Sequence, residues 1–166
     1  MTTLPLISYP TKIVILDDDP LFTDALSESL KNDYSLLKFN DPNQCINFFK
    51  QYTPLSSNLR FVRGCNELEN YNTSGHLPVD IDFSALKEFR TKENRMDEVS
   101  VILVDYNMPG MNGLEFCRQL KSLPAKKILL TGEASEKVAV TAFNEGYIDC
   151  YIKKVVRPHQ RILKII

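Results

Sequence analysis

Three consecutive aspartates, Asp17, Asp18 and Asp19, directly follow the apolar run at residues 13–16. Two like charges about 4 Å apart repel by roughly 1 kcal/mol in water and by roughly 4 kcal/mol at a more protein-like dielectric. Carboxylates gathered in this way therefore either lie in open solvent or surround a cation. Carboxylate oxygens suit a hard cation, and Mg2+ binds through one or two carboxylates plus waters and phosphate oxygens. The triplet is thus a candidate half of a Mg2+ site, and its alternative is a solvated loop.

Further polar residues end other apolar runs along the chain: Asp105 in VILVD, Thr131 in ILLT, and Lys153 or Lys154 in YIKK. An aspartate carboxylate can act as a nucleophile towards a phosphoryl group. A phosphoryl group in transfer spreads its charge over its equatorial oxygens, so positioning and cations supply most of the catalysis. A threonine hydroxyl could donate a hydrogen bond to one of these oxygens, and a lysine could pair with another.

The elements that must position these residues alternate along the chain. Short apolar runs rich in β-branched residues predict buried strands, and stripes at helical spacing predict the helices between them. The predicted strands are 12–16, 34–39, 99–104, 127–130 and 148–154, and the predicted helices are 20–31, 42–52, 112–123, 135–144 and 158–166. In helix 135–144, Val138, Ala139 and Ala142 are predicted to face inwards. This alternation implies parallel crossovers and a doubly wound α/β fold, with five strands and helices on both faces.

The predicted fold would bring the strand-end residues together. In an open α/β sheet, ligands bind outside the carboxyl ends of the strands, at the point where the winding reverses. If the strand order is 2-1-3-4-5, this point lies between strands 12–16 and 99–104, which carry the aspartate triplet and Asp105. We therefore expect the polar groups to converge on one crevice.

One interval is too long for this alternation. Between Asp17 and Asp105, the chain has roughly 40 residues more than two helices, two strands and their loops require. We place this insertion at about 51–98 and expect part of it, 84–96, to be helical. Long segments of this kind in compact domains are usually functional.

Composition narrows the class of protein. The chain has 166 residues, 43% hydrophobic and 25% charged, with a net charge of -1. These values fit one globular domain, and the net charge shows no excess of basic residues that would indicate nucleic-acid binding. No apolar run is long enough to cross a membrane, and the N-terminus lacks a signal-peptide layout. The four cysteines are scattered and contain no C-x-x-C pair, which argues against a structural zinc site and favours reduced thiols in the cytoplasm.

This set of residues resembles the receiver domain of two-component response regulators. The resemblance rests on the acidic pair after the first strand, on VDYNMPGMNGLEF around Asp105, on LLTG, and on the lysine after the last strand. It implies a single receiver domain over 1–166, interrupted by the insertion, with a flavodoxin-like sheet in the order 2-1-3-4-5. It also implies a phosphorylation-dependent signalling switch, not an enzyme, which catalyses only its own phosphorylation and dephosphorylation.

The resemblance assigns roles at the acidic cluster. Asp105 would accept a phosphoryl group from a histidine kinase or a histidine phosphotransfer protein. Asp18 would bind Mg2+ directly, Asp17 would act mainly through water, and the main-chain carbonyl of Asn107 would complete the metal shell, with Asp105 as a further ligand. Asp19 would be peripheral.

The resemblance leaves two neighbouring residues as candidates for the site lysine. The usual family spacing, counted from Gly146, indicates Lys153. The family's aromatic-x-x-Lys pattern instead pairs Tyr151 with Lys154, and we favour Lys154. Thr131 and Tyr151 would carry the switch, since Thr131 is drawn to the phosphoryl group and Tyr151 fills the space that it leaves.

Two expectations concern the surroundings of the acceptor. Asn107 and Glu133 would flank the approach of the hydrolytic water, and their polarity favours a short-lived phosphate.

In the family, the face built by the helix at 135–144, the strand at 148–154 and the helix at 158–166 often mediates dimerisation or partner docking. A homodimer through this face is therefore a candidate.

Two alternatives stay open on the sequence. A haloacid-dehalogenase-type phosphohydrolase would use Asp17 as nucleophile and Asp19 as general acid. The position of Asp105 before Thr131, and the lack of an acidic motif after Lys154, argue against it.

The sequence ending ILKII favours the interpretation that this chain is the N-terminal part of a longer regulator over that of a stand-alone receiver.

Overall fold

The fold centres on a five-stranded parallel sheet in the order β2-β1-β5-β6-β7. The computed structural model describes residues 11–54, 62–64, 79–91, 96–132 and 136–154. The strands of the sheet are β1 (Lys12–Leu16), β2 (Ser35–Phe39), β5 (Val99–Asp105), β6 (Lys126–Thr131) and β7 (Cys150–Lys153). All four neighbouring pairs are parallel. This is the predicted 2-1-3-4-5 order, so the predicted flavodoxin-like fold class is confirmed.

The helices that pack on this sheet are α1 (Pro20–Leu30), α2 (Pro42–Gln51), α4 (Gly113–Gln119) and α5 (Glu136–Asn144). Aspartate side chains cap the first two at their amino ends. The side chain of Asp19 accepts a hydrogen bond from the Leu21 amide at 2.9 Å, and that of Asp41 accepts one from the Asn43 amide at 2.8 Å. Each cap precedes a proline, which suits the first helical position because it has no N–H to leave unpaired. The third aspartate of the triplet is therefore used to start α1.

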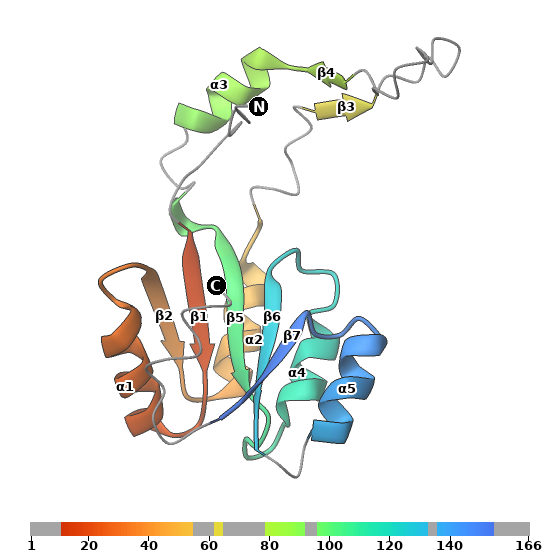
Figure 1. Cartoon of the computed structure of the whole chain (residues 1–166). Helices are drawn as coiled ribbons and strands as arrows, with labels where there is room; N and C mark the ends of the chain where they lie inside the picture. Colours follow the sequence, from red (N-terminus) through yellow and green to blue (C-terminus); the bar gives the residue numbers. More distant parts are fainter. Residues whose placement is uncertain (1–10, 55–61, 65–78, 92–95, 133–135, 155–166) are drawn as a thin grey trace, which may run out of the picture.

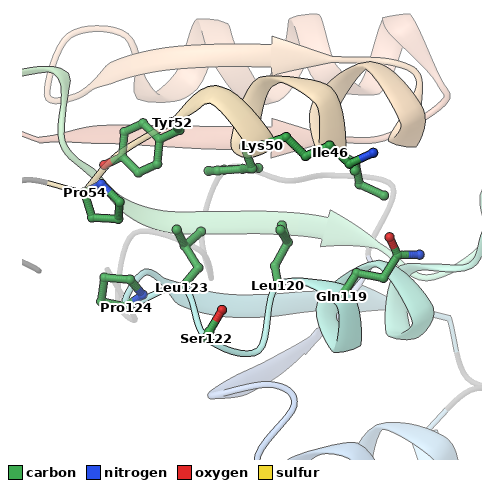
Figure 2. A pocket seen from close by; sticks show the side chains of 10 residues that line it. Ile46, Lys50, Tyr52, Pro54, Gln119, Leu120, Ser122, Leu123 and Pro124 are labelled. Carbon is green, nitrogen blue, oxygen red and sulfur yellow. The ribbon is translucent and has the colours of Figure 1, made fainter.

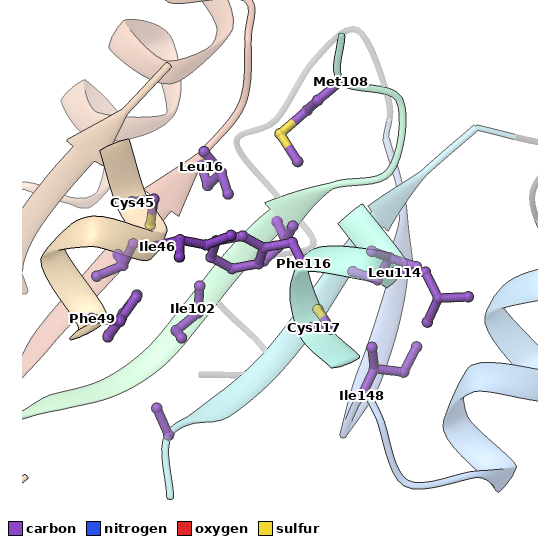
Figure 3. Packing of buried hydrophobic residues seen from close by; sticks show 14 of the residues in the cluster. Leu16, Cys45, Ile46, Phe49, Ile102, Met108, Leu114, Phe116, Cys117 and Ile148 are labelled. Carbon is purple, nitrogen blue, oxygen red and sulfur yellow. The ribbon is translucent and has the colours of Figure 1, made fainter. Parts of the chain in front are cut away.

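Strand residues alternate between two apolar clusters, one on each face of the sheet. Ile13 and Ile15 pack with Leu26 and Leu30 of α1 on one face. The other face packs against α2, α4 and α5. There Phe116 of α4 is 1% exposed and points towards the side chains of α2 (Figure 3). The predicted helix at 158–166 lies outside the described residues.

One predicted core residue of α5 is not buried. Ala139 and Ala142 face inwards as predicted, whereas Val138 is 37% exposed. Because α5 packs on β6 and β7, at one side of the sheet, its buried stripe is narrower than its apolar sequence indicates.

The insertion has structure of its own. It contains a two-stranded antiparallel sheet of β3 (Val62–Gly64) and β4 (Val79–Ile81), followed by helix α3 (Phe83–Thr91). The helix was predicted at 84–96 and the two strands were not. These elements lie beyond the amino ends of the main strands (Figure 1). Since the acidic cluster follows the carboxyl ends of the strands, the described part of the insertion lies at the opposite edge.

Among the described helices, none combines the length and the apolar content that a bilayer crossing requires.

Candidate functional site

Sheet register brings three carboxylates together. In the pairing of β1 with β5, Leu16 lies opposite Val104, so Asp17 and Asp105 follow at matching positions. One carboxylate oxygen from each of Asp17, Asp18 and Asp105 lies within 4.8 Å of the others. Asp17 is 0% exposed and Asp105 is 4% exposed, while Asp18 faces solvent. The cluster is therefore buried on one side and open to water on the other.

Lys154 supplies a cation to this cluster. Its ammonium Nζ lies 2.7 Å from Asp17 Oδ2 and 3.2 Å from Asp105 Oδ1. Its backbone N–H donates to the Thr131 carbonyl at 2.8 Å, which ties the residue to the end of β6. Lys153 ends β7 and its side chain is exposed. Of the two candidate lysines, Lys154 is the one that reaches the carboxylates.

The charges in the cluster act on one another. Burial and the negative charge of Asp17 raise the pKa of Asp105, and Lys154 offsets part of this effect. Burial alone would lower the pKa of Lys154, but its hydrogen bond to Asp17 and the charges of Asp105 and Asp17 outweigh burial and raise it. The lysine is therefore held in its charged form beside carboxylates whose mutual repulsion it only partly relieves.

The carboxylates fit a hard divalent cation. Their ligand atoms are all oxygens, and the formal negative charge of the three aspartates exceeds the positive charge of Lys154. Asp18 lies on the open side, where a bound ion would keep contact with water, as Mg2+ requires. The donor set and its exposure thus suit Mg2+.

Two residues that the sequence analysis overlooked brace the backbone here. The Asn40 side chain donates to the Asp17 carbonyl at 2.8 Å and to the Thr23 hydroxyl at 3.2 Å. Thr23 is 1% exposed and donates to the Pro20 carbonyl at 2.9 Å. Asn40 follows β2 as Asp17 follows β1, so the strand-end pattern could have revealed it.

The aromatic ring of Phe22 is a third overlooked feature. Its centroid lies 4.4 Å from the Lys154 ammonium. In the sequence, Phe22 was simply part of the apolar stripe of α1, and no local signal connects it with a lysine more than 130 residues away.

Of the predicted switch residues, Thr131 is linked to the cluster through its bond to Lys154, and Tyr151 lies on the neighbouring strand β7. Thr131 is 3% exposed and its hydroxyl donates to the Gly132 carbonyl at 2.7 Å. Tyr151 pairs in register with Leu129. It is half-buried against the apolar cluster on the sheet face that α2, α4 and α5 cover. Asn107 is exposed just after Asp105, and Glu133 lies outside the described residues.

A pocket of about 410 Å3 lies elsewhere, between α2 and the end of α4. Apolar and aromatic side chains form most of its wall, including Ile46, Tyr52, Leu120 and Leu123 (Figure 2). None of the acidic cluster residues lines it, so the candidate site is the acidic cluster at the strand ends and not this pocket.

Known proteins resemble the chain in sequence and structure. The family model described as "Response regulator receiver domain" matches residues 72–166. The cyclic di-GMP phosphodiesterase response regulator RpfG of Xanthomonas campestris pv. campestris (strain 8004) is 41% identical over 66 residues, covering 37% of this chain and 17% of RpfG. The transcriptional regulatory protein ResD of Bacillus subtilis (strain 168) is 38% identical over 66 residues, covering 39% of this chain and 27% of ResD.

A solved structure extends the likeness over most of the chain. The response regulator LqsR of Legionella pneumophila superimposes with a TM-score of 0.65 at 33% identity, covering 89% of this chain and 39% of LqsR. The chain thus spans well under half the length of these three relatives.

The phosphohydrolase alternative finds no support in these comparisons. Its expected general acid, Asp19, instead uses its carboxylate to cap α1. The family match over more than half of the chain, together with the strand order, shows that this chain belongs to the response regulator receiver domain family, the phosphorylation-dependent switches of two-component signalling.

Proposed function

We propose that the chain is switched by phosphorylation of Asp105. One observation carries this assignment: the Asp105 carboxylate is buried beside the ammonium of Lys154 and clusters with two further carboxylates. Such a group is held in place, is shielded from bulk water, and has a cation ready for the charge that a phosphoryl group brings.

The transfer requires little covalent chemistry from the chain. A carboxylate oxygen of Asp105 attacks the phosphorus of a phosphohistidine on the donor, the P–N bond breaks, and its electrons return to the imidazole. Lys154 can then leave Asp17 for a phosphoryl oxygen, and the Thr131 hydroxyl can turn from the Gly132 carbonyl to another. Bound Mg2+ would neutralise charge on the phosphoryl oxygens.

The ligands proposed for Mg2+ are Asp17, Asp18, Asp105 and the Asn107 carbonyl. Asp17 is paired with Lys154 and fully buried, which supports a role through water instead of direct coordination. Asp18 is exposed and supports the direct role.

Signal output is proposed to pass through Thr131 and Tyr151. Leu129, the register partner of Tyr151, lies two residues before Thr131 on β6, so both switch residues serve one face of the sheet. A movement of Thr131 towards the phosphoryl group would leave room for the Tyr151 ring and reshape α5 and β7. That is a two-state element biased by differential contacts.

The proposed partners follow from this role. The donor would be a histidine kinase or a histidine phosphotransfer protein in the cytoplasm, and α5 with β7 would contribute to a homodimer or docking face. Val140 and Phe143 of α5 are exposed apolar residues, which supports an interface there. Asn107 and Glu133 are proposed to govern the access of water to the acyl phosphate. The reactions that the chain catalyses would be its own phosphorylation and dephosphorylation.

Phosphate uptake tests the acceptor. With acetyl phosphate and Mg2+, the parent is expected to gain one acid-labile, base-labile phosphate, and Asp105→Asn none, because an amide cannot form the acyl phosphate. Intact-mass measurement, followed by borohydride reduction and peptide mapping, locates it. Label that persists in Asp105→Asn would assign the acceptor elsewhere.

Metal affinity tests the role of Asp18. Asp18→Asn is expected to weaken Mg2+ binding at least about tenfold from a micromolar-to-millimolar parent value, because the site has few protein ligands to share the loss. Calorimetric titration measures it. Asp19→Asn is the matched control, since asparagine caps a helix as well as aspartate does. Equal loss in both variants would contradict a specific role of Asp18.

A further inference from the structure

Phe22 lies where it can control the lysine of the site. Its ring is carried by α1, directly after the acidic cluster, and packs against the apolar cluster on the α1 face of the sheet. The Lys154 ammonium lies 4.4 Å from the ring centroid, within the range of an attractive cation–π contact. The ring is thus fixed by the core on one side and presents its π-electrons to a cation on the other.

Lys154 needs such a support. Its backbone is anchored by the bond to the Thr131 carbonyl, but four flexible methylenes separate that anchor from the ammonium. The side chain is 27% exposed, so the ammonium could turn into solvent instead of staying beside the carboxylates. Holding a lysine in one conformation costs side-chain entropy. A contact that already keeps the ammonium beside the carboxylates reduces this cost during the reaction.

The two carboxylates alone cannot hold the ammonium throughout transfer. Once a phosphoryl group is on Asp105, the contact of Lys154 with that carboxylate must change, and the ammonium must move from Asp17 towards a phosphoryl oxygen. A hydrogen bond to one oxygen opposes this movement. Attraction to a ring face depends weakly on direction, so it persists while the ammonium swings between oxygens.

We propose that Phe22 is a positioning residue for phosphoryl transfer, which keeps the Lys154 ammonium over its ring and beside Asp105. This rests on the proposed function of Asp105 as the acceptor. Phe22 touches neither the donor nor the reacting atoms in this assignment, and it acts through the lysine.

A spectroscopic measurement tests the contact in the parent protein. Protons above a ring face are shielded by the ring current, so the ε-methylene protons of Lys154 should resonate upfield of the position of a solvated lysine. They should return to the ordinary position in Phe22→Leu and remain upfield in Phe22→Tyr. Lys121, whose ammonium lies 4.8 Å from the Tyr147 ring centroid, should be shielded as well and should not change in the Phe22 variants. Ordinary shifts for Lys154 in the parent would overturn the proposal without the need for any variant.

Phosphate uptake from acetyl phosphate tests the consequence. At saturating Mg2+, Phe22→Leu is expected to react about three- to tenfold more slowly than the parent, and Phe22→Tyr close to the parent rate. Leucine keeps apolar bulk against the core, so packing is largely retained, and thermal unfolding checks this. Leu21→Ala, at the neighbouring and 81% exposed position, is the control and should match the parent.

The outcomes separate this inference from the proposed function. A parent that takes up no phosphate on Asp105 contradicts the proposed function. A labelled parent with an equally fast Phe22→Leu contradicts the role of Phe22 alone. Equal slowing in the leucine and tyrosine variants would assign Phe22 to packing and also overturn the proposal.

Discussion

Lys154→Met is expected to take up phosphate from acetyl phosphate about 100-fold more slowly than the parent, because removing one preorganised charge partner typically costs a factor of this order. Among the described residues, no other lysine or arginine forms an ion pair with Asp17 or Asp105. Methionine keeps the length and apolar stem of lysine but has no charge for the phosphoryl oxygens. Initial rates of phosphate incorporation at saturating Mg2+ measure the effect.

The neighbouring lysine provides a matched control. Lys153→Met removes the same charge one residue earlier, where the side chain is exposed, and should react close to the parent rate. Thermal unfolding with Mg2+ present checks that both variants are folded. A slow Lys153→Met with a normal Lys154→Met would assign the role to Lys153 and contradict the geometry of the cluster.

Gly113→Ala is expected to lower the free energy of unfolding by about 3 kcal/mol or more, the upper range for forced overpacking. A Cβ at Gly113 would fall against the backbone carbonyl of Asp105, closer than real Cβ atoms approach, and 3.0 Å from Leu129 Cδ1. A backbone carbonyl cannot relieve the clash by changing rotamer, as a side chain can. The higher helix propensity of alanine relative to glycine contributes about 1 kcal/mol, which is too little to compensate.

Gly132→Ala is the comparison for this substitution. A Cβ at Gly132 meets nothing within 4 Å, so its stability should stay close to that of the parent. Urea unfolding of the three proteins measures the difference. A Gly113→Ala protein as stable as Gly132→Ala would show that the acceptor strand and α4 can separate at little cost.

The amino-acid sequence was sufficient to predict the strands of the main sheet and the polar residues that end most of them. Buried parallel strands are apolar on both faces, so they are recognisable as short uninterrupted runs, and the alternation with helices restricts the topology. Capping is equally local, which is why the start of α2 after Asp41 could be predicted. The two strands of the insertion were missed because β3 and β4 have three residues each, too few for a periodic signal.

The roles of the individual site residues depend on contacts that form only in the folded chain. In the sequence, two family spacings pointed to different lysines and favoured Lys154 over Lys153 only by the pattern with Tyr151. The position where β7 ends beside β6 determines that Lys154 reaches the carboxylates. The contact of Phe22 with Lys154 joins the first helix to the end of the last strand, so it depends on the strand order and on the packing of α1. Local sequence specifies which groups are available, and long-range packing specifies their distances.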